Sequence, residues 1–210
     1  MDPLFIIDSG AALWAAPLFK KINGADVVSR NTIRDSQTIK RKAPGVKFIL
    51  TDGDGVLNDG SFSFDADGNE VSKYSLRDVQ AVKRLRELAG VEVGLVNDRD
   101  SYSLEQLALK MGIRELHLSV ETKELTLMNI VDKLNIKLED VLYIGDEMED
   151  IKAMEKAGLS ACPLDAVYET RNTADYVCNS CGGHGVLREI SELIIASKTN
   201  QMLAASITAE

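Results

Sequence analysis

The sequence predicts an α/β fold in which a Rossmann-like parallel sheet carries helices on both faces. From residue 45 onward, short apolar runs alternate with segments whose apolar residues recur at helical spacing. That rhythm is typical of parallel strands joined by crossover helices. The runs are also continuously apolar, as in FIL at 48–50, which indicates strands covered on both faces.

The expected elements follow one another in chain order. Strands are expected at 46–51, 91–96, 116–118, 141–144 and 159–161, where the runs rich in branched residues lie. Between the first two strands, SFSFDADGNEVSKYSL alternates around Asp67-Gly68 and predicts a hairpin over 61–75. Helices are expected from Asp78, as N-cap, through residue 89, then at 103–111, 124–134 and 150–157, and from 185 through 194.

A chain of 210 residues has room for one good core. We expect the main domain at 45–198. Residues 1–44 are interpreted as an N-terminal extension and a polar linker ending at Pro44-Gly45, and residues 199–210 as a flexible tail.

Composition limits the partners. A net charge of −9 argues against nucleic acid, which is held by basic surfaces. The apolar N-terminus has no basic region, and Asp8 interrupts it before spanning length, so no membrane anchor is expected. Three cysteines are too few for a disulfide framework and fit a reducing compartment, so we expect a cytoplasmic protein.

Polar groups follow several of the predicted strands. Asp52 and Asp54 end the first strand, Asn97-Asp98-Arg99 follow the second, Lys123 opens a helix after the third, and Asp146 and Asp150 follow the fourth. The carboxyl ends of parallel strands form one crevice, so these groups should meet there.

Clustered carboxylates repel one another unless a cation is present, and a compact set of oxygen ligands favours Mg²⁺. With a lysine to hold phosphate, the set suits phosphoryl transfer: one aspartate attacks phosphorus, and the other donates a proton and later takes one from water. Simpler interpretations exist for single residues, because a lone Asp-x-Asp is usually turn chemistry and Asp150 could cap its helix.

Taken in order, DGDGV at 52–56, Lys123, and Gly145-Asp146 with Asp150 resemble the haloacid dehalogenase superfamily of phosphatases. The resemblance implies Asp52 as nucleophile, Asp54 as general acid/base, and Lys123 as the phosphate-side lysine. It also implies a Mg²⁺ site made of Asp52, the Asp54 backbone carbonyl and Asp146, with Asp150 in support.

The segments DGVLNDG, KYSLRD, VGLVNDR, YIGDEMED, GLSACPLDA and CGGHGVLREI resemble the 3-deoxy-D-manno-octulosonate 8-phosphate phosphatase subfamily over roughly 46–196. Relatives of this group are phosphatases of nine-carbon sialic-type sugars and the C-terminal domain of acylneuraminate cytidylyltransferases. The resemblance implies no separate cap domain and a homotetramer in which hairpins and a neighbour's C-terminal segment close the site. It further implies substrate contacts at Arg99, Arg77, Gly183 and His184.

The chain departs from the pattern at three positions. Asn97 stands where the superfamily has Thr or Ser, Asp98 where it has Gly, and His184 where the subfamily usually has Arg. The Asn97 amide can donate to a phosphate oxygen, which gives it a catalytic role. Arg99 matches the eight-carbon branch of the subfamily, so we expect a Mg²⁺-dependent phosphatase of a phosphorylated eight-carbon sugar acid. The alternatives are a nine-carbon substrate, or a weakly active assembly module of the cytidylyltransferase type.

Overall fold

The computed structural model describes residues 36–207. The apolar start of the chain lies outside the described residues. The described part contains a six-stranded sheet in the order β3-β2-β1-β4-β5-β6, in which every neighbouring pair is parallel. The strands are β1 Phe48–Asp52, β2 Glu92–Val96, β3 Glu115–His117, β4 Val141–Ile144, β5 Leu159–Cys162 and β6 Tyr176–Val177.

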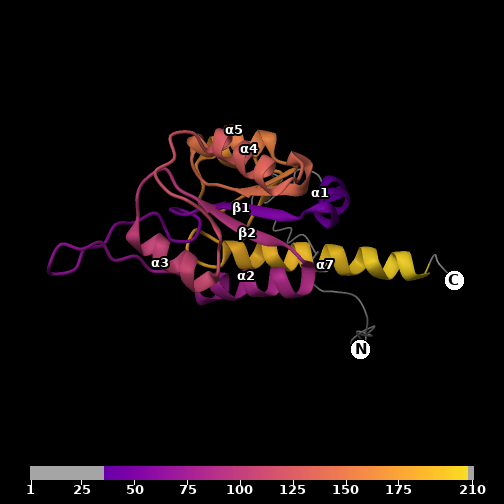
Figure 1. Cartoon of the computed structure of the whole chain (residues 1–210), viewed down its shortest axis with the longest axis horizontal. Helices are drawn as coiled ribbons and strands as arrows, with labels where there is room; N and C mark the ends of the chain where they lie inside the picture. Colours follow the sequence, from indigo (N-terminus) through magenta and orange to yellow (C-terminus); the bar gives the residue numbers. More distant parts are fainter. Residues whose placement is uncertain (1–35, 208–210) are drawn as a thin grey trace, which may run out of the picture. The chain divides into compact units, whose positions relative to one another are not determined.

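Helices connect the strands and cover the sheet. They are α1 Ser36–Lys42, α2 Leu76–Ala89, α3 Tyr102–Met111, α4 Lys123–Leu134, α5 Ile151–Lys156, α6 Tyr168–Thr173 and α7 Val186–Ile207. Short 3₁₀ turns lie at Ala43–Gly45, Leu138–Asp140 and Met148–Asp150. In Figure 1, α2, α3 and α7 lie on one face of the sheet, and α4 and α5 lie on the other.

Alternation along the strands builds a core on each face. Ile49 packs into the cluster that includes residues of α2, α3 and α7, whereas Phe48 and Leu50 pack into the cluster with α4 and α5. All five β1 residues are buried, which is why this strand is continuously apolar from Phe48 to Leu50. The predicted parallel sheet with helices on both faces is confirmed.

β1 lies between β2 and β4, so the chain proceeds to one side of β1 and later crosses to the other. The loops that leave β1, β2 and β4 therefore diverge at their carboxyl ends. A crevice is expected at such a switch point, and it is the usual ligand position in open α/β sheets.

β6 and α6 are among the short elements that were not predicted from the sequence. β6 has two residues, and α6 is the polar hexapeptide YETRNT, so neither contains an apolar period. The prediction that Asp78 caps α2 is wrong. Ser75 is the N-cap, and its hydroxyl accepts from the Arg77 backbone N–H. Asp78 instead accepts from the Arg188 N–H at the start of α7, 2.8 Å away.

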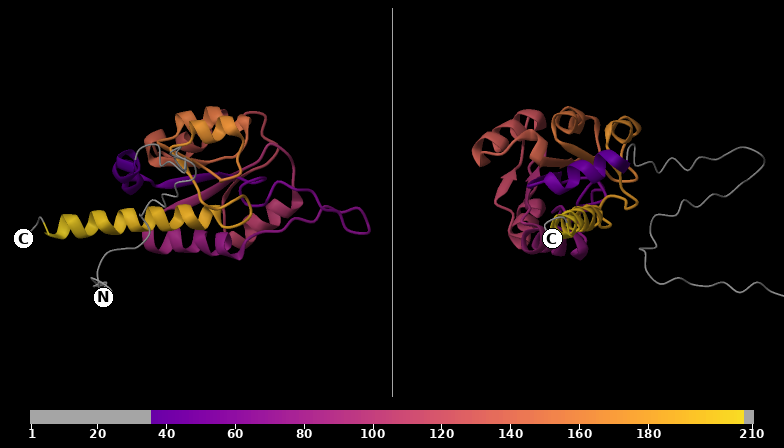
Figure 2. Two further views of the ribbon diagram at one scale, coloured as in Figure 1. Left: turned by 180° about the vertical axis from the view of Figure 1, so that it is seen from behind. Right: turned by 90° about the vertical axis from the view of Figure 1, so that its right-hand side faces the viewer.

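The predicted hairpin projects from the body of the domain as a loosely paired loop (Figure 2). Phe64 and Glu70 form its antiparallel bridge, and the Val71 N–H donates to Ser63 at 2.8 Å. Phe62 and Phe64 are mostly exposed on it. The segment is therefore anchored at its base and presents aromatic rings to its surroundings.

Both ends of the expected main domain continue as helix. α1 occupies part of the expected linker and contributes Ile39 to the core. α7 continues through the expected tail to Ile207, and Lys198 donates to the Pro44 carbonyl at 2.9 Å. Among residues 36–207, no helix is both long enough and apolar enough to span a membrane.

Candidate active site

Three aspartates and a lysine meet at the carboxyl end of the sheet. Asp52 is the last residue of β1, Lys123 is the first of α4, and Asp146 and Asp150 follow β4. The Lys123 ammonium lies 3.0 Å from Asp52 Oδ2 and 2.8 Å from Asp150 Oδ1. One carboxylate oxygen from each of the three aspartates lies within 4.8 Å of the others. These four residues therefore converge at the carboxyl ends of the parallel strands, as expected.

Asp150 is fully engaged by the protein. Its Oδ1 accepts from Lys123 and, at 2.7 Å, from the Tyr143 hydroxyl. Its Oδ2 accepts from the backbone N–H groups of Asp146 and Glu147. Asp150 thus closes the turn after β4 and holds Lys123. It stands at the N-cap position of α5, but its side chain makes no capping hydrogen bond to that helix, so the simpler interpretation as a helix cap is not confirmed.

Asp52 and Asp146 each have an oxygen with no protein partner. Both Oδ1 atoms are buried and accept no hydrogen bond, and a buried, unpartnered carboxylate oxygen is costly. A divalent cation bound by oxygen ligands would satisfy both atoms. Gly55, with a φ of 75°, allows the Asp146 carboxylate to lie close to the backbone, because a Cβ at residue 55 would overlap that carboxylate. These residues fit a Mg²⁺ ion.

The electrostatics point the same way. Burial, with the nearby charge of Asp150, raises the pKa of Asp52 well above its usual range despite Lys123. The same two causes raise the pKa of Asp146 to about 7. Burial would lower the pKa of Lys123, but Asp52 and Asp150 together raise it. One ammonium faces three acids, so the site has excess negative charge that a cation would neutralise.

Asp54 lies beside this cluster, and donors surround its carboxylate. Asn58 donates to Oδ1 at 2.7 Å. Asn97 and Arg99 both donate to Oδ2, at 3.1 Å and 2.6 Å. The Asn97 amide also donates to the Arg99 carbonyl and accepts from the Asp54 backbone N–H. In this structure both Asn97 amide protons are therefore directed to protein oxygens.

A cleft of about 240 Å³ opens over these groups. Its lining includes Asp52, Asp54, Arg99, Lys123 and Asp146. Asp98, Glu147 and Glu149 add further acids at the same cleft.

Three predicted substrate residues do not line this cleft in the single chain: Arg77, Gly183 and His184. The glycine turn packs instead against the loop after β1, where the Gly183 N–H donates to the Val56 carbonyl at 3.0 Å. The exposed His184 ring contacts the Gly182 carbonyl through Nδ1 at 2.7 Å. Arg77 is exposed on α2 near Gly185.

Sequence reasoning assigned no site role to Asn58, Glu70 or Tyr143. Tyr143 carries the only hydroxyl in the otherwise apolar strand β4, and a buried tyrosine hydroxyl usually has a hydrogen-bond partner. Glu70 pairs with Arg99 through two hydrogen bonds, but the hairpin pattern gives no sign of that contact.

Comparisons with known proteins show which family has this fold. A family model described as haloacid dehalogenase-like hydrolase matches residues 119–190. The 3-deoxy-D-manno-octulosonate 8-phosphate phosphatase of Haemophilus influenzae is 31% identical over 160 residues, which are 76% of this chain and 88% of that protein. The chain belongs to the 3-deoxy-D-manno-octulosonate 8-phosphate phosphatase family of haloacid dehalogenase-like hydrolases.

Solved members of the family share the fold. The phosphatase of Moraxella catarrhalis, crystallised with a magnesium ion, a phosphate ion and a KDO molecule, is 28% identical and has a TM-score of 0.76. The match covers 82% of this chain and 99% of that one. The cobalt-bound Haemophilus influenzae phosphatase is 32% identical with a TM-score of 0.72, covering 75% of this chain and 92% of that one.

Proposed function

We propose that this protein is a Mg²⁺-dependent phosphatase of a phosphorylated 3-deoxy-2-keto sugar acid, with 3-deoxy-D-manno-octulosonate 8-phosphate as first choice. The observation that carries the proposal is the pair of buried, unpartnered oxygens on Asp52 and Asp146 beside Lys123. Membership of a phosphatase family supports the reaction class. The magnesium, phosphate and sugar acid bound to the Moraxella catarrhalis relative support the cofactor and the substrate class.

In the proposed reaction, Asp52 is the nucleophile. Its carboxylate oxygen attacks phosphorus, and the bond from phosphorus to the sugar oxygen breaks as Asp54 donates a proton to that oxygen. Water then attacks the aspartyl phosphate while Asp54 takes a proton from it, which releases phosphate and restores Asp52. Asp54 is suited to both proton steps because it lines the cleft that contains Asp52.

The remaining residues orient and neutralise. Lys123, fixed by Asp52 and Asp150, presents a positive charge to the phosphoryl oxygens. Mg²⁺ would be held by Asp52, Asp146 and the Asp54 backbone carbonyl, with Asp150 fixing the loop, and when bound it supplies charge neutralisation for the phosphoryl group. Asn97 acts on Asp54 through its amide, and Arg99 is placed to contact the substrate at the cleft.

The proposal includes a homotetramer acting in the cytoplasm. Exposed Phe62 and Phe64 on the hairpin are apolar surface that a neighbouring copy would cover. Arg77, Gly183 and His184 would then complete a site formed between subunits. The free thiols of Cys162, Cys178 and Cys181 agree with a reducing compartment.

One experiment tests the function. Purified protein with MgCl₂ is given the eight-carbon and nine-carbon sugar acid phosphates, and released phosphate is measured beside an Asp52→Asn control. Selective release from the eight-carbon substrate supports the proposal, and selective release from the nine-carbon one supports the runner-up. Release no greater than the control, with a clean tetramer by light scattering, would favour an assembly module.

A further inference from the structure

We infer that Glu70 is a positioning residue for the general acid/base: it fixes the Arg99 guanidinium in the orientation that holds Asp54, and so couples the hairpin to the reaction centre. This inference rests on the proposed function. It assigns a role to a residue that lies outside the cleft, because Glu70 is not among the residues lining the cleft while Arg99 and Asp54 are.

The geometry of Arg99 carries the inference. Its Nε donates to Asp54 Oδ2 at 2.6 Å, while Nη1 and Nη2 donate to the two Glu70 oxygens at 2.9 Å and 3.1 Å. A guanidinium is planar with donors in a fixed fork, so a bidentate partner sets the direction of Nε. The Phe62 ring, 4.7 Å from the guanidinium carbon, covers one of its faces.

Glu70 is itself held in place. Ser72 donates to Glu70 Oε1 at 3.3 Å, and Ser103, near the start of α3, donates to Ser72 at 3.1 Å. Tyr74 contacts the same Ser103 hydroxyl at 2.9 Å. The contacts therefore run from α3 through the hairpin base to Arg99 and Asp54.

The pair is partly shielded from water. The side chains of Arg99, Glu70 and Asp54 are 30%, 28% and 21% exposed. A geometrically ideal, bidentate pair in this setting is stronger than a freely exposed one. Loss of Glu70 would release two of the three donor contacts that define the Arg99 orientation.

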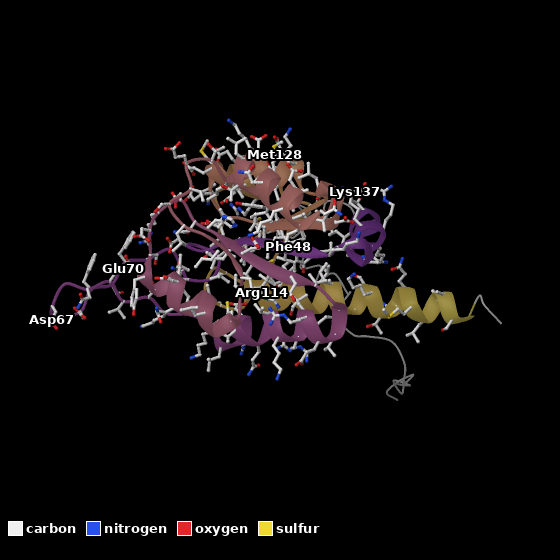
Figure 3. The ribbon with its side chains drawn as sticks, in the orientation of Figure 1. Phe48, Asp67, Glu70, Arg114, Met128 and Lys137 are labelled. Atoms are coloured by element: carbon white, nitrogen blue, oxygen red, sulfur yellow. The ribbon has the colours of Figure 1, made fainter. Side chains whose placement is uncertain are left out.

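The position of Glu70 supplies a matched control. Figure 3 labels Glu70 near the base of the hairpin and Asp67 at its far end. Asp67 is an exposed acid of the same hairpin. The Asp67→Asn variant therefore removes the same charge as Glu70→Gln without touching Arg99.

The test compares two phosphate esters that carry no carboxylate, so that a direct contact between Arg99 and a sugar acid cannot contribute. Glycerol 3-phosphate has a leaving oxygen that needs a proton, whereas the p-nitrophenyl leaving group needs none. In the full-length protein with MgCl₂, Glu70→Gln should lower kcat/KM for glycerol 3-phosphate about tenfold and change that for p-nitrophenyl phosphate less than about twofold. Arg99→Lys should give the same selectivity, and Asp67→Asn should match wild type.

Hydrogen exchange gives a second readout that needs no activity. Glu70→Gln and Arg99→Lys should both speed amide exchange in peptides covering 61–75, where the Val71 N–H is bonded to Ser63. Equal losses on both esters, or hairpin exchange unchanged from wild type, would overturn the inference. Absence of phosphate release by wild type would overturn the proposed function and the general-acid role with it, and the exchange data would then separately decide whether the hairpin and Arg99 are coupled.

Discussion

The ammonium of Lys123 lies 3.0 Å from Asp52 and 2.8 Å from Asp150, and among the described residues it is the only cationic group that forms an ion pair with either carboxylate. Both acids are buried, and Asp146 lies in the same cluster. The site therefore combines a strong local attraction with an excess of negative charge. Its stability should depend on the lysine, on pH and on a divalent cation.

Replacing Lys123 by Met should destabilise the fold. The change leaves Asp52 and Asp150 buried without their cation, and removing one partner of a buried ion pair costs about 3–5 kcal/mol. The free energy of unfolding from urea titration checks this. Lys152 is an exposed lysine of α5. The Lys152→Met variant is therefore the matched control, and its free energy of unfolding should fall by less than about 1 kcal/mol. Equal losses in the two variants would show that the buried pair contributes nothing special.

Replacing Asp52 by Asn should abolish turnover while keeping the fold. The amide cannot form the acyl phosphate, so kcat should fall by at least about 10³-fold. In metal-free buffer the variant should be as stable as wild type or more so, because one of three mutually repelling acids is gone. Thermal unfolding with and without MgCl₂, beside a phosphate-release assay, measures both effects. Retention of the wild-type rate would rule out the covalent route.

The metal-free protein should lose stability as pH rises through about 7. The pKa of Asp146 in the folded protein is raised from 3.8 to about 7, so the native state binds more protons than the unfolded state between these values. The contribution of protonated Asp146 to the free energy of unfolding is fully present below pH 3.8 and is lost as pH rises through about 7. Mg²⁺ replaces the proton, so its effect on Tm should be larger at about pH 8 than at about pH 6. A Mg²⁺ shift in Tm that is independent of pH would contradict this account.

Gly55→Ala should weaken Mg²⁺ binding. The new Cβ would overlap the Asp146 carboxylate, and φ at Gly55 is 75°. Gly68→Ala is the control because φ is 84° there and nothing lies within 4 Å of the added carbon. Calorimetric titration with MgCl₂ should show at least about tenfold weaker binding for Gly55→Ala, roughly 1.4 kcal/mol, and unchanged binding for Gly68→Ala. If both variants bound equally, the close approach of Gly55 would have no role in the metal site.

The core of the site was predictable because one rule brings it together. Asp52, Asp146 and Lys123 all follow parallel strands at their carboxyl ends, and the apolar runs locate those strands along the chain. The hydrogen bonds that Asp150 accepts from Lys123 and Tyr143 were not predicted, because they depend on how α4 and β4 pack beside the loop after β4.

Other contacts depend on the paths of loops, which the spacing of apolar residues does not predict. Glu70 reaches Arg99 only because the path of the hairpin brings its base beside the loop after β2. Ser75 rather than Asp78 caps α2, and Asp78 instead accepts from the Arg188 N–H at the start of α7. Arg77, Gly183 and His184 remain predictions whose test lies in the assembled protein.

The most direct measurement is to catch the phosphoryl group on the enzyme. Acid quench during turnover with MgCl₂, followed by mass mapping of the peptides, should place a phosphoryl group on Asp52, and none should form with EDTA or in Asp52→Asn. Phosphoryl transfer to a different residue, or full turnover by Asp52→Asn, would contradict the account.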